Sequence, residues 1–147
     1  MPWKTTVDRA KKDLREGKAA STAAGEFVRE EIEHVRSGKH GARSPKQAIA
    51  IGLSKARRAG VPLTPPPKGQ ASERTRKSAR SAYEAGQGRK TTRRSPRRSA
   101  AAEGALRRER RSSASARELS RQAKGAASRR KRRGQPGTRR GGKRSSR

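Results

Sequence analysis

Within three stretches of the first 60 positions, apolar side chains lie three or four residues apart, the spacing of helices that bury one face. In the first such stretch, Val7, Ala10 and Leu14 form a single stripe. The pattern predicts three short helices, over residues 7–16, 22–37 and 45–59. Each is followed by a glycine that can end a helix in the left-handed conformation, at Gly17, Gly38 and Gly60.

Polar residues mark the beginnings of the first and third helices. Thr5 followed by Asp8 has the spacing of a capping box. Ser44 followed by Gln47 has the same spacing, and Pro45 occupies the first helical position, where its missing N–H costs nothing. We therefore expect side-chain caps at Thr5 and Ser44.

The second helix, which we expect to start near Ser21 or Thr22, has an apolar side and a charged side. Val28, Ile32 and Val35 lie along the apolar side at helical spacing, and Phe27 lies beside them. We expect the opposite side to be exposed and to carry Arg29, Glu30, Glu33 and Arg36. Its carboxylates would keep phosphate away from this face.

The apolar pattern stops near Gly60. The remaining 87 residues contain five large apolar side chains, Val61, Leu63, Tyr83, Leu106 and Leu119. So few cannot offset the loss of about 1 to 2 kcal/mol of backbone entropy for each ordered residue. We therefore predict an all-α N-terminal head of about three short helices over residues 1–60, a stiff Pro-rich linker over 61–68, and a long, mostly disordered basic tail over 69–147.

Two segments of this tail have a helix-forming composition, residues 100–111 and 115–124. In the second of them, Ser115 and Glu118 have the spacing of a capping box. We expect both segments to become helical when phosphate neutralises their charge.

Positive charge is concentrated in the same tail. The formal net charge of the chain is +30, and the last 87 residues supply +23 of it, from 28 Lys and Arg against five Glu. A polycation that does not fold alone needs a polyanion, and DNA and RNA release condensed counterions when Lys and Arg replace them. The nucleic-acid contacts we expect are Lys46, Lys55, Arg57 and Arg58 in the head and Arg93, Arg94, Arg97, Arg98, Arg107, Arg108, Arg110, Arg111, Arg129, Arg130, Lys131, Arg132, Arg133, Arg139, Arg140, Lys143 and Arg144 in the tail.

One tail segment, residues 95–98 with the sequence SPRR, resembles the Ser-Pro-basic-basic units of linker-histone tails. In those units a turn is thought to lay two cations along the minor groove. The alternative is a chance Ser-Pro pair in a tail rich in Ser and Arg. The similar segment 44–47 (SPKQ) is explained entirely by the helix cap described above.

Side chains suited to catalysis or metal binding are scarce. The chain has no cysteine and two histidines, His34 and His40, on either side of a predicted helix end. A metal site would need a third ligand at compatible geometry. We therefore expect His34 to be exposed near a helix C-terminus, His40 to be available to phosphate, and no metal or other cofactor. Because a Gly-rich phosphate loop is also lacking, we predict that the protein is not an enzyme.

The few aromatic residues bear on the kind of nucleic acid. Trp3 precedes the first helix, where an aromatic more often packs against the helix start than stacks on a base. Tyr83 is isolated in the tail and is either incidental or stacks on an exposed base. Interleaved aromatics, typical of proteins that read single strands, are missing. The likelier target is the backbone of duplex or structured nucleic acid, with little sequence discrimination.

Residues 26–60 resemble a family of small basic bacterial proteins of unknown function. The resemblance depends on the loop GKHG at 38–41 and the segment KQAIAIGLSKARRAG at 46–60. It implies a bacterial, intracellular protein and supplies no activity. The tail is similar in composition to those of bacterial histone-H1-like nucleoid proteins.

The leading hypothesis is a nucleoid-associated protein of the bacterial cytoplasm that binds DNA without sequence specificity. RNA or ribosome association is the first alternative, because the same cations would serve it. The second is a protein-interaction or assembly module that the tail tethers to nucleic acid. A homodimer through the head is possible, since about 60 residues is near the size at which a monomer becomes marginal. We expect no membrane association, because the tail lacks the apolar face of an interfacial helix and the chain shows neither a secretory signal nor the apolar run of about 20 residues that a membrane span requires.

Overall fold

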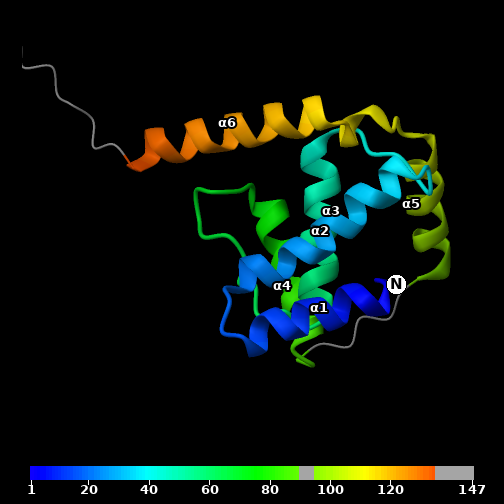
Figure 1. Cartoon of the computed structure of the whole chain (residues 1–147). Helices are drawn as coiled ribbons and strands as arrows, with labels where there is room; N and C mark the ends of the chain where they lie inside the picture. The colour runs from blue at the N-terminus through cyan, green and yellow to red at the C-terminus, as the bar shows by residue number, and fades with distance from the viewer. Residues whose placement is uncertain (90–94, 135–147) are drawn as a thin grey trace, which may run out of the picture.

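A computed structural model of the protein describes residues 1–89 and 95–134. Within those ranges all the regular secondary structure is helical, apart from an isolated bridge between Lys68 and Ala71 (Figure 1). The elements in chain order are α1 (Lys4–Arg15), α2 (Ala20–Arg36), α3 (Pro45–Arg58), α4 (Glu73–Gly86), α5 (Pro96–Arg108), the short 3-10 helix η1 (Ser112–Ala114) and α6 (Ala116–Gly134). No helix in these ranges is both long and apolar enough to cross a membrane.

The crossing of α2 over α3 is the centre of the fold, with α1 packed on α2 and α4 on α3 (Figure 1). The two central helices approach closely because α3 has glycine at the crossing: a Cβ added to Gly52 would lie 2.7 Å from the Cα of Val28. Around this crossing lies the larger of two apolar clusters, whose buried members are Ala10, Ala23, Ala24, Phe27, Ala56 and Val61. Most of this core is alanine, so close backbone approach replaces bulky side chains.

The start of α3 confirms the predicted cap. The backbone N–H of Gln47 donates to the Ser44 hydroxyl at 3.3 Å, and Pro45 is the first helical residue. The Gln47 side chain also accepts from the backbone N–H of Arg43 at 2.6 Å. These two bonds satisfy the backbone N–H groups of Gln47 and Arg43, which have no partner within the helix.

The cap predicted for α1 was wrong. The helix begins at Lys4, its N-cap is Trp3, and no side chain caps it. The reason is a tertiary contact, because the carboxylate of Glu30 on α2 accepts the backbone N–H of Trp3 and fixes the helix start one turn earlier. The second helix likewise begins at Ala20 without a side-chain cap.

The prediction of a long disordered tail was also wrong, since residues 73–134 contain α4, α5, η1 and α6. Counting large apolar side chains missed the packing of small ones. Ala79 and Ala82 of α4 are buried, and so is Ala114 of η1. At Gly86 the backbone of α4 meets the carbonyl of Arg57 so closely that no Cβ would fit.

The predicted linker is fastened to α3 by an arginine. Arg57 is 8 % exposed, and its Nε donates to the carbonyl of Leu63 at 3.1 Å. Val61, the first linker residue, is buried in the larger core. The extended chain therefore follows the surface of α3 before α4 begins.

A second, smaller core joins the C-terminal elements to the centre. It consists of Val35, Ala42, Ala48 and Ala114, with Ile32 packed against it. Backbone bonds reinforce the junction: the N–H of Gly41 donates to the carbonyl of Leu106 at 2.8 Å, and the N–H of Ala42 donates to that of Arg110 at 3.0 Å. Residues 106–114 are thus held in place by the loop between α2 and α3.

Of the two tail segments predicted to fold on binding, residues 100–108 are helical in α5 and residues 116–124 in α6, without nucleic acid. The predicted cap at Ser115 is present, because its hydroxyl accepts the backbone N–H of Glu118 at 3.3 Å. α6 contacts η1 and α3, and its C-terminal half extends away from the other helices (Figure 1). In its last turn the Arg133 side chain donates to the carbonyl of Gly69, in the segment between α3 and α4, at 3.4 Å.

Candidate functional site

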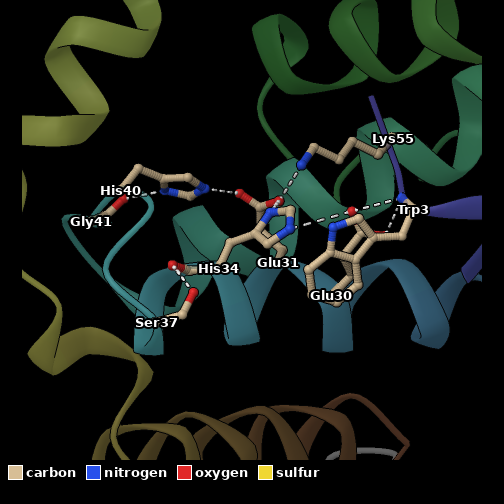
Figure 2. Close-up of polar contacts among 8 residues, drawn as sticks. All are labelled: Trp3, Glu30, Glu31, His34, Ser37, His40, Gly41 and Lys55. Carbon is tan, nitrogen blue, oxygen red and sulfur yellow. Dashed lines mark hydrogen bonds and ion pairs between the residues drawn. The ribbon is translucent and has the colours of Figure 1, made fainter.

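Ionisable side chains are buried along one side of α2, beside the larger core. Glu31 is fully buried, Glu30 is 3 % exposed and His34 is 7 % exposed. Glu31 lies four residues after Phe27 and four before Val35, so it occupies the middle of the helix's most buried stripe. Such groups remain charged inside a protein only when they are paired. Their partners are shown in Figure 2.

Only one of the two oxygens of the Glu31 carboxylate accepts a hydrogen bond. Oε2 accepts from Nζ of Lys55 on α3, at 2.5 Å. Oε1 lies 2.9 Å from Nε2 of His40, but the angle between them does not suit a hydrogen bond, and Oε1 is buried without a partner. The His40 ring is itself fixed, because its Nδ1 is 2.8 Å from the carbonyl of Gly41.

The neighbouring carboxylate, Glu30, fastens the beginning of the chain to α2. Both of its oxygens are 3.1 Å from the backbone N of Trp3. The Trp3 ring meets His34 edge to face, with centroids 4.8 Å apart, and Nζ of Lys39 lies 4.7 Å from the Trp3 centroid. Trp3 is the N-cap residue of α1, but its ring contacts His34 of α2 and Lys39.

His34 is buried, which contradicts the expected exposed position. Burial is the main reason that its pKa is lowered, and the positive charges of Lys55 and Lys39 lower it further, against the smaller opposing effect of Glu31 and Glu30. The ring is therefore neutral at pH 7. Its Nε2 is 3.6 Å from Oε1 of Glu30 and has no hydrogen-bond partner.

A groove of about 850 Å³ opens above this cluster, between the α2–α3 pair and α5. Glu31, His34 and His40 reach its surface, and α5 supplies the facing side. The basic side chains in its lining are Lys39, Lys55, Arg58, Arg98 and Arg107.

The residues predicted to bind nucleic acid fall into three groups. The first group consists of two residues that bind other parts of the protein. Lys55 pairs with Glu31, and Arg57 is buried against the linker, where desolvation lowers its pKa. The exposed group consists of Lys46, Arg58, Arg97, Arg98, Arg107, Arg108, Arg110, Arg111, Arg129, Arg130, Lys131, Arg132 and Arg133. The third group, Arg93, Arg94, Arg139, Arg140, Lys143 and Arg144, lies outside the described residues.

The segment resembling a linker-histone unit begins a helix. Ser95 is the N-cap of α5, its hydroxyl accepts the backbone N–H of Arg98 at 3.4 Å, and Pro96 is the first helical residue. The arrangement repeats that of the α3 start. Tyr83 lies half-buried on α4 and lines a depression beside Pro65, Pro66 and Pro67.

The most cationic exposed element is α6. None of its 19 residues is buried, and it carries eight Lys or Arg against the single acidic residue Glu118. Five of those cations are consecutive, at 129–133. This helix and the buried cluster under the groove are the two candidate sites.

Comparison with known proteins adds a family but no activity. Residues 15–68 match a family of unknown function (DUF6496), which agrees with the resemblance seen in the sequence. No curated protein and no solved structure matches the chain, so no named relative supports the likeness of the tail to histone-like proteins. The matched segment includes α2, α3 and the loop between them, and therefore every ionisable residue of the buried cluster.

Proposed function

We propose that the protein binds nucleic acid through backbone phosphates without reading the sequence, and that its ligand is DNA of the bacterial nucleoid. The observation that carries the proposal is α6, a helix without a buried residue that carries eight cations and one carboxylate. A 19-residue helix is about 28 Å long, similar to one turn of duplex DNA. An element of this length and charge can contact several phosphates at once.

The charges of α6 explain why an anionic ligand would suit it. Arg129 and Arg133 are four residues apart and carry like charges, which destabilises an isolated helix by tenths of a kcal/mol per pair. Within α6 only Arg121 has an acidic partner, Glu118 at 3.1 Å. Phosphates along the helix would offset this repulsion and release their own counterions.

The composition of the surface supports binding without sequence discrimination. Arg and Lys contacts to phosphate position a protein but carry no sequence information. The described part of α6 has no aromatic residue to stack on bases. Exposed cations elsewhere, such as Arg97 and Arg98 on α5, would add to the same effect.

The test compares two variants with the same net charge. In the first, all five cations at 129–133 are changed to Gln. In the second, five exposed cations of α1, namely Lys4, Arg9, Lys11, Lys12 and Arg15, are changed to Gln. Both lower the formal charge from +30 by five, so only the location of the lost charge differs.

Fluorescence anisotropy with a 20-base-pair duplex at several salt concentrations measures the result. If the eight cations of α6 each neutralise a phosphate, a plot of the logarithm of the association constant against the logarithm of the salt concentration has a slope of about −7 or steeper. The α6 variant should flatten that slope by about 4 to 5, and the α1 variant by less than 1. Equal flattening in both variants would contradict the assignment to α6.

RNA is the alternative ligand with the same phosphate chemistry. Competition between the duplex and a structured RNA of equal charge, at physiological salt, distinguishes the two. If the protein retains the RNA in preference to the duplex, its ligand is ribosomal or other RNA and not the DNA of the nucleoid.

A further inference from the structure

The structure leaves one buried carboxylate oxygen unexplained. Glu31 is fully buried, yet its Oε1 accepts no hydrogen bond. An unsatisfied buried oxygen of a charged group is costly, and an ion is one of the things that relieves the cost. One ligand atom each from Glu31, His34 and His40 lies within 4.8 Å of the other two.

The tautomer of the His40 ring places a nitrogen lone pair beside that oxygen. A carbonyl only accepts hydrogen bonds, so the 2.8 Å contact with Gly41 places the ring hydrogen on Nδ1. In the neutral ring, Nε2 then carries a lone pair and lies 2.9 Å from Oε1 of Glu31. Metal-binding histidines characteristically donate their other ring N–H to a backbone carbonyl in this way.

The geometry of this contact is that of two ligands to one ion. Two atoms at about 2.0 to 2.1 Å from a common zinc ion are about 3 to 3.4 Å apart, and each points at the ion rather than at the other. The contact between His40 and Glu31 has nearly this separation, and its angle is unsuited to a hydrogen bond.

We propose that Glu31, His34 and His40 bind a divalent transition-metal ion of the zinc class. Two imidazoles and one carboxylate form a ligand set that zinc prefers, whereas magnesium and calcium prefer oxygen ligands. Nδ1 of His34 is 3.8 Å from Oε2 of Glu31, and one ligand atom of each of the three residues lies within 4.8 Å of the other two, so a shift of these side chains closes the set. Nε2 of His34 faces Glu30 at 3.6 Å, which places a carboxylate behind this ligand.

The surroundings provide both support and access. Lys55 holds the other oxygen of Glu31 and so fixes the carboxylate. The groove above the cluster is lined by all three ligand residues and gives an ion a way in, with room for water at a fourth position. The sequence suggested no metal because the third ligand, Glu31, was not recognised as buried.

The test titrates zinc chloride into the full-length protein without nucleic acid, after chelator treatment, at pH 7.5. Competition with a chromophoric chelator gives the affinity and the stoichiometry. We expect one ion per chain, an unchanged affinity in a hundredfold excess of magnesium, and a rise in melting temperature on binding. Cobalt in place of zinc should show the visible absorption of a four-coordinate site.

The decisive variant is His40→Ala, because His40 lies on a loop and its loss leaves α2 intact. It should weaken zinc binding at least tenfold and abolish the rise in melting temperature. Glu31→Gln should do the same where it folds, as judged by circular dichroism. Glu33→Gln, an exposed residue of the same helix, is the control and should bind within twofold of wild type.

Two results would overturn the proposal. The first is a folded wild-type protein that takes up no zinc at one equivalent, which would mean that a proton on His40 balances Glu31. The second is undiminished binding by His40→Ala. Neither result depends on whether the protein binds DNA.

Discussion

Replacing Gly41 with alanine should detach the C-terminal elements from the centre of the fold without unfolding it. Gly41 is buried, and a Cβ at this position would overlap the backbone carbonyl of Glu109. Its φ is not in the left-handed region, so the cost of substitution comes from lack of space. The backbone of residues 106–114 must move away to admit a methyl group.

The free energy that this substitution costs the junction follows from the contacts that would be lost. The amides of Gly41 and Ala42 donate to the carbonyls of Leu106 and Arg110, and each bond contributes about 0.5 to 1.5 kcal/mol. Exposing the methyl group of Ala114 adds about 0.8 kcal/mol. The total is about 2 to 4 kcal/mol, which raises the open fraction of this junction on the order of 30- to 700-fold.

Native-state hydrogen exchange measures this opening directly. In Gly41→Ala, the amides of Ala42 and Ala114 should exchange faster by that factor, while amides around Phe27 in the larger core keep their protection. The control is Gly104→Ala in α5, where a Cβ would meet nothing within 4 Å. It should stabilise the helix by about 0.5 to 1 kcal/mol. Wild-type protection of Ala114 in Gly41→Ala would refute the proposed junction.

Two further substitutions test the centre of the fold by urea denaturation. Ser44→Ala removes the hydroxyl that caps Gln47 at the start of α3 and should lower the free energy of unfolding by about 1 kcal/mol; no change would mean that this cap does not stabilise the helix. Lys55→Met leaves the buried carboxylate of Glu31 without its ammonium partner and should cost about 3 to 5 kcal/mol. Lys46→Met, at an exposed position of the same helix, should cost less than about 0.5 kcal/mol, and equal losses in the two variants would contradict a special role for Lys55.

Local rules predicted those parts of the fold that depend on local chemistry. The start of α3 was predictable from Ser44, Pro45 and Gln47 because the bonds of a capping box involve neighbouring residues. The start of α1 was not, since Glu30, 27 residues from Trp3, accepts its amide. Tertiary contacts of that kind leave no mark in the local sequence.

The order of the C-terminal half was missed because its packing uses alanine and glycine. Ala114 has no exposed surface, yet it contributes nothing to a count of large apolar side chains. The backbone at Gly41 and Gly86 approaches other segments more closely than any side chain would allow. Such contacts form between segments that are far apart in the sequence and depend on how their surfaces fit together. Hydrophobic periodicity describes only neighbouring residues and therefore cannot predict them.

The buried cluster carried a signal that could have been recognised. Phe27, Glu31 and Val35 are spaced four residues apart, so a helix that buries the two apolar residues also buries the carboxylate between them. His34 lies three residues after Glu31, on the neighbouring side of the helix. His40 could be added only from the structure, since the path of the loop determines where its ring points.

The junction at η1 determines how the charges of α6 are presented. Ala114 is buried, and its carbonyl accepts from Nε of Arg36 at 3.0 Å, so the base of α6 is clamped rather than hinged. The last turn is also held, because the Arg133 side chain donates to the carbonyl of Gly69 at 3.4 Å, so the cations of α6 keep a set separation from Lys46 at the start of α3. A ligand that touches both surfaces must therefore fit that spacing, whereas a flexible polycation would adapt to any.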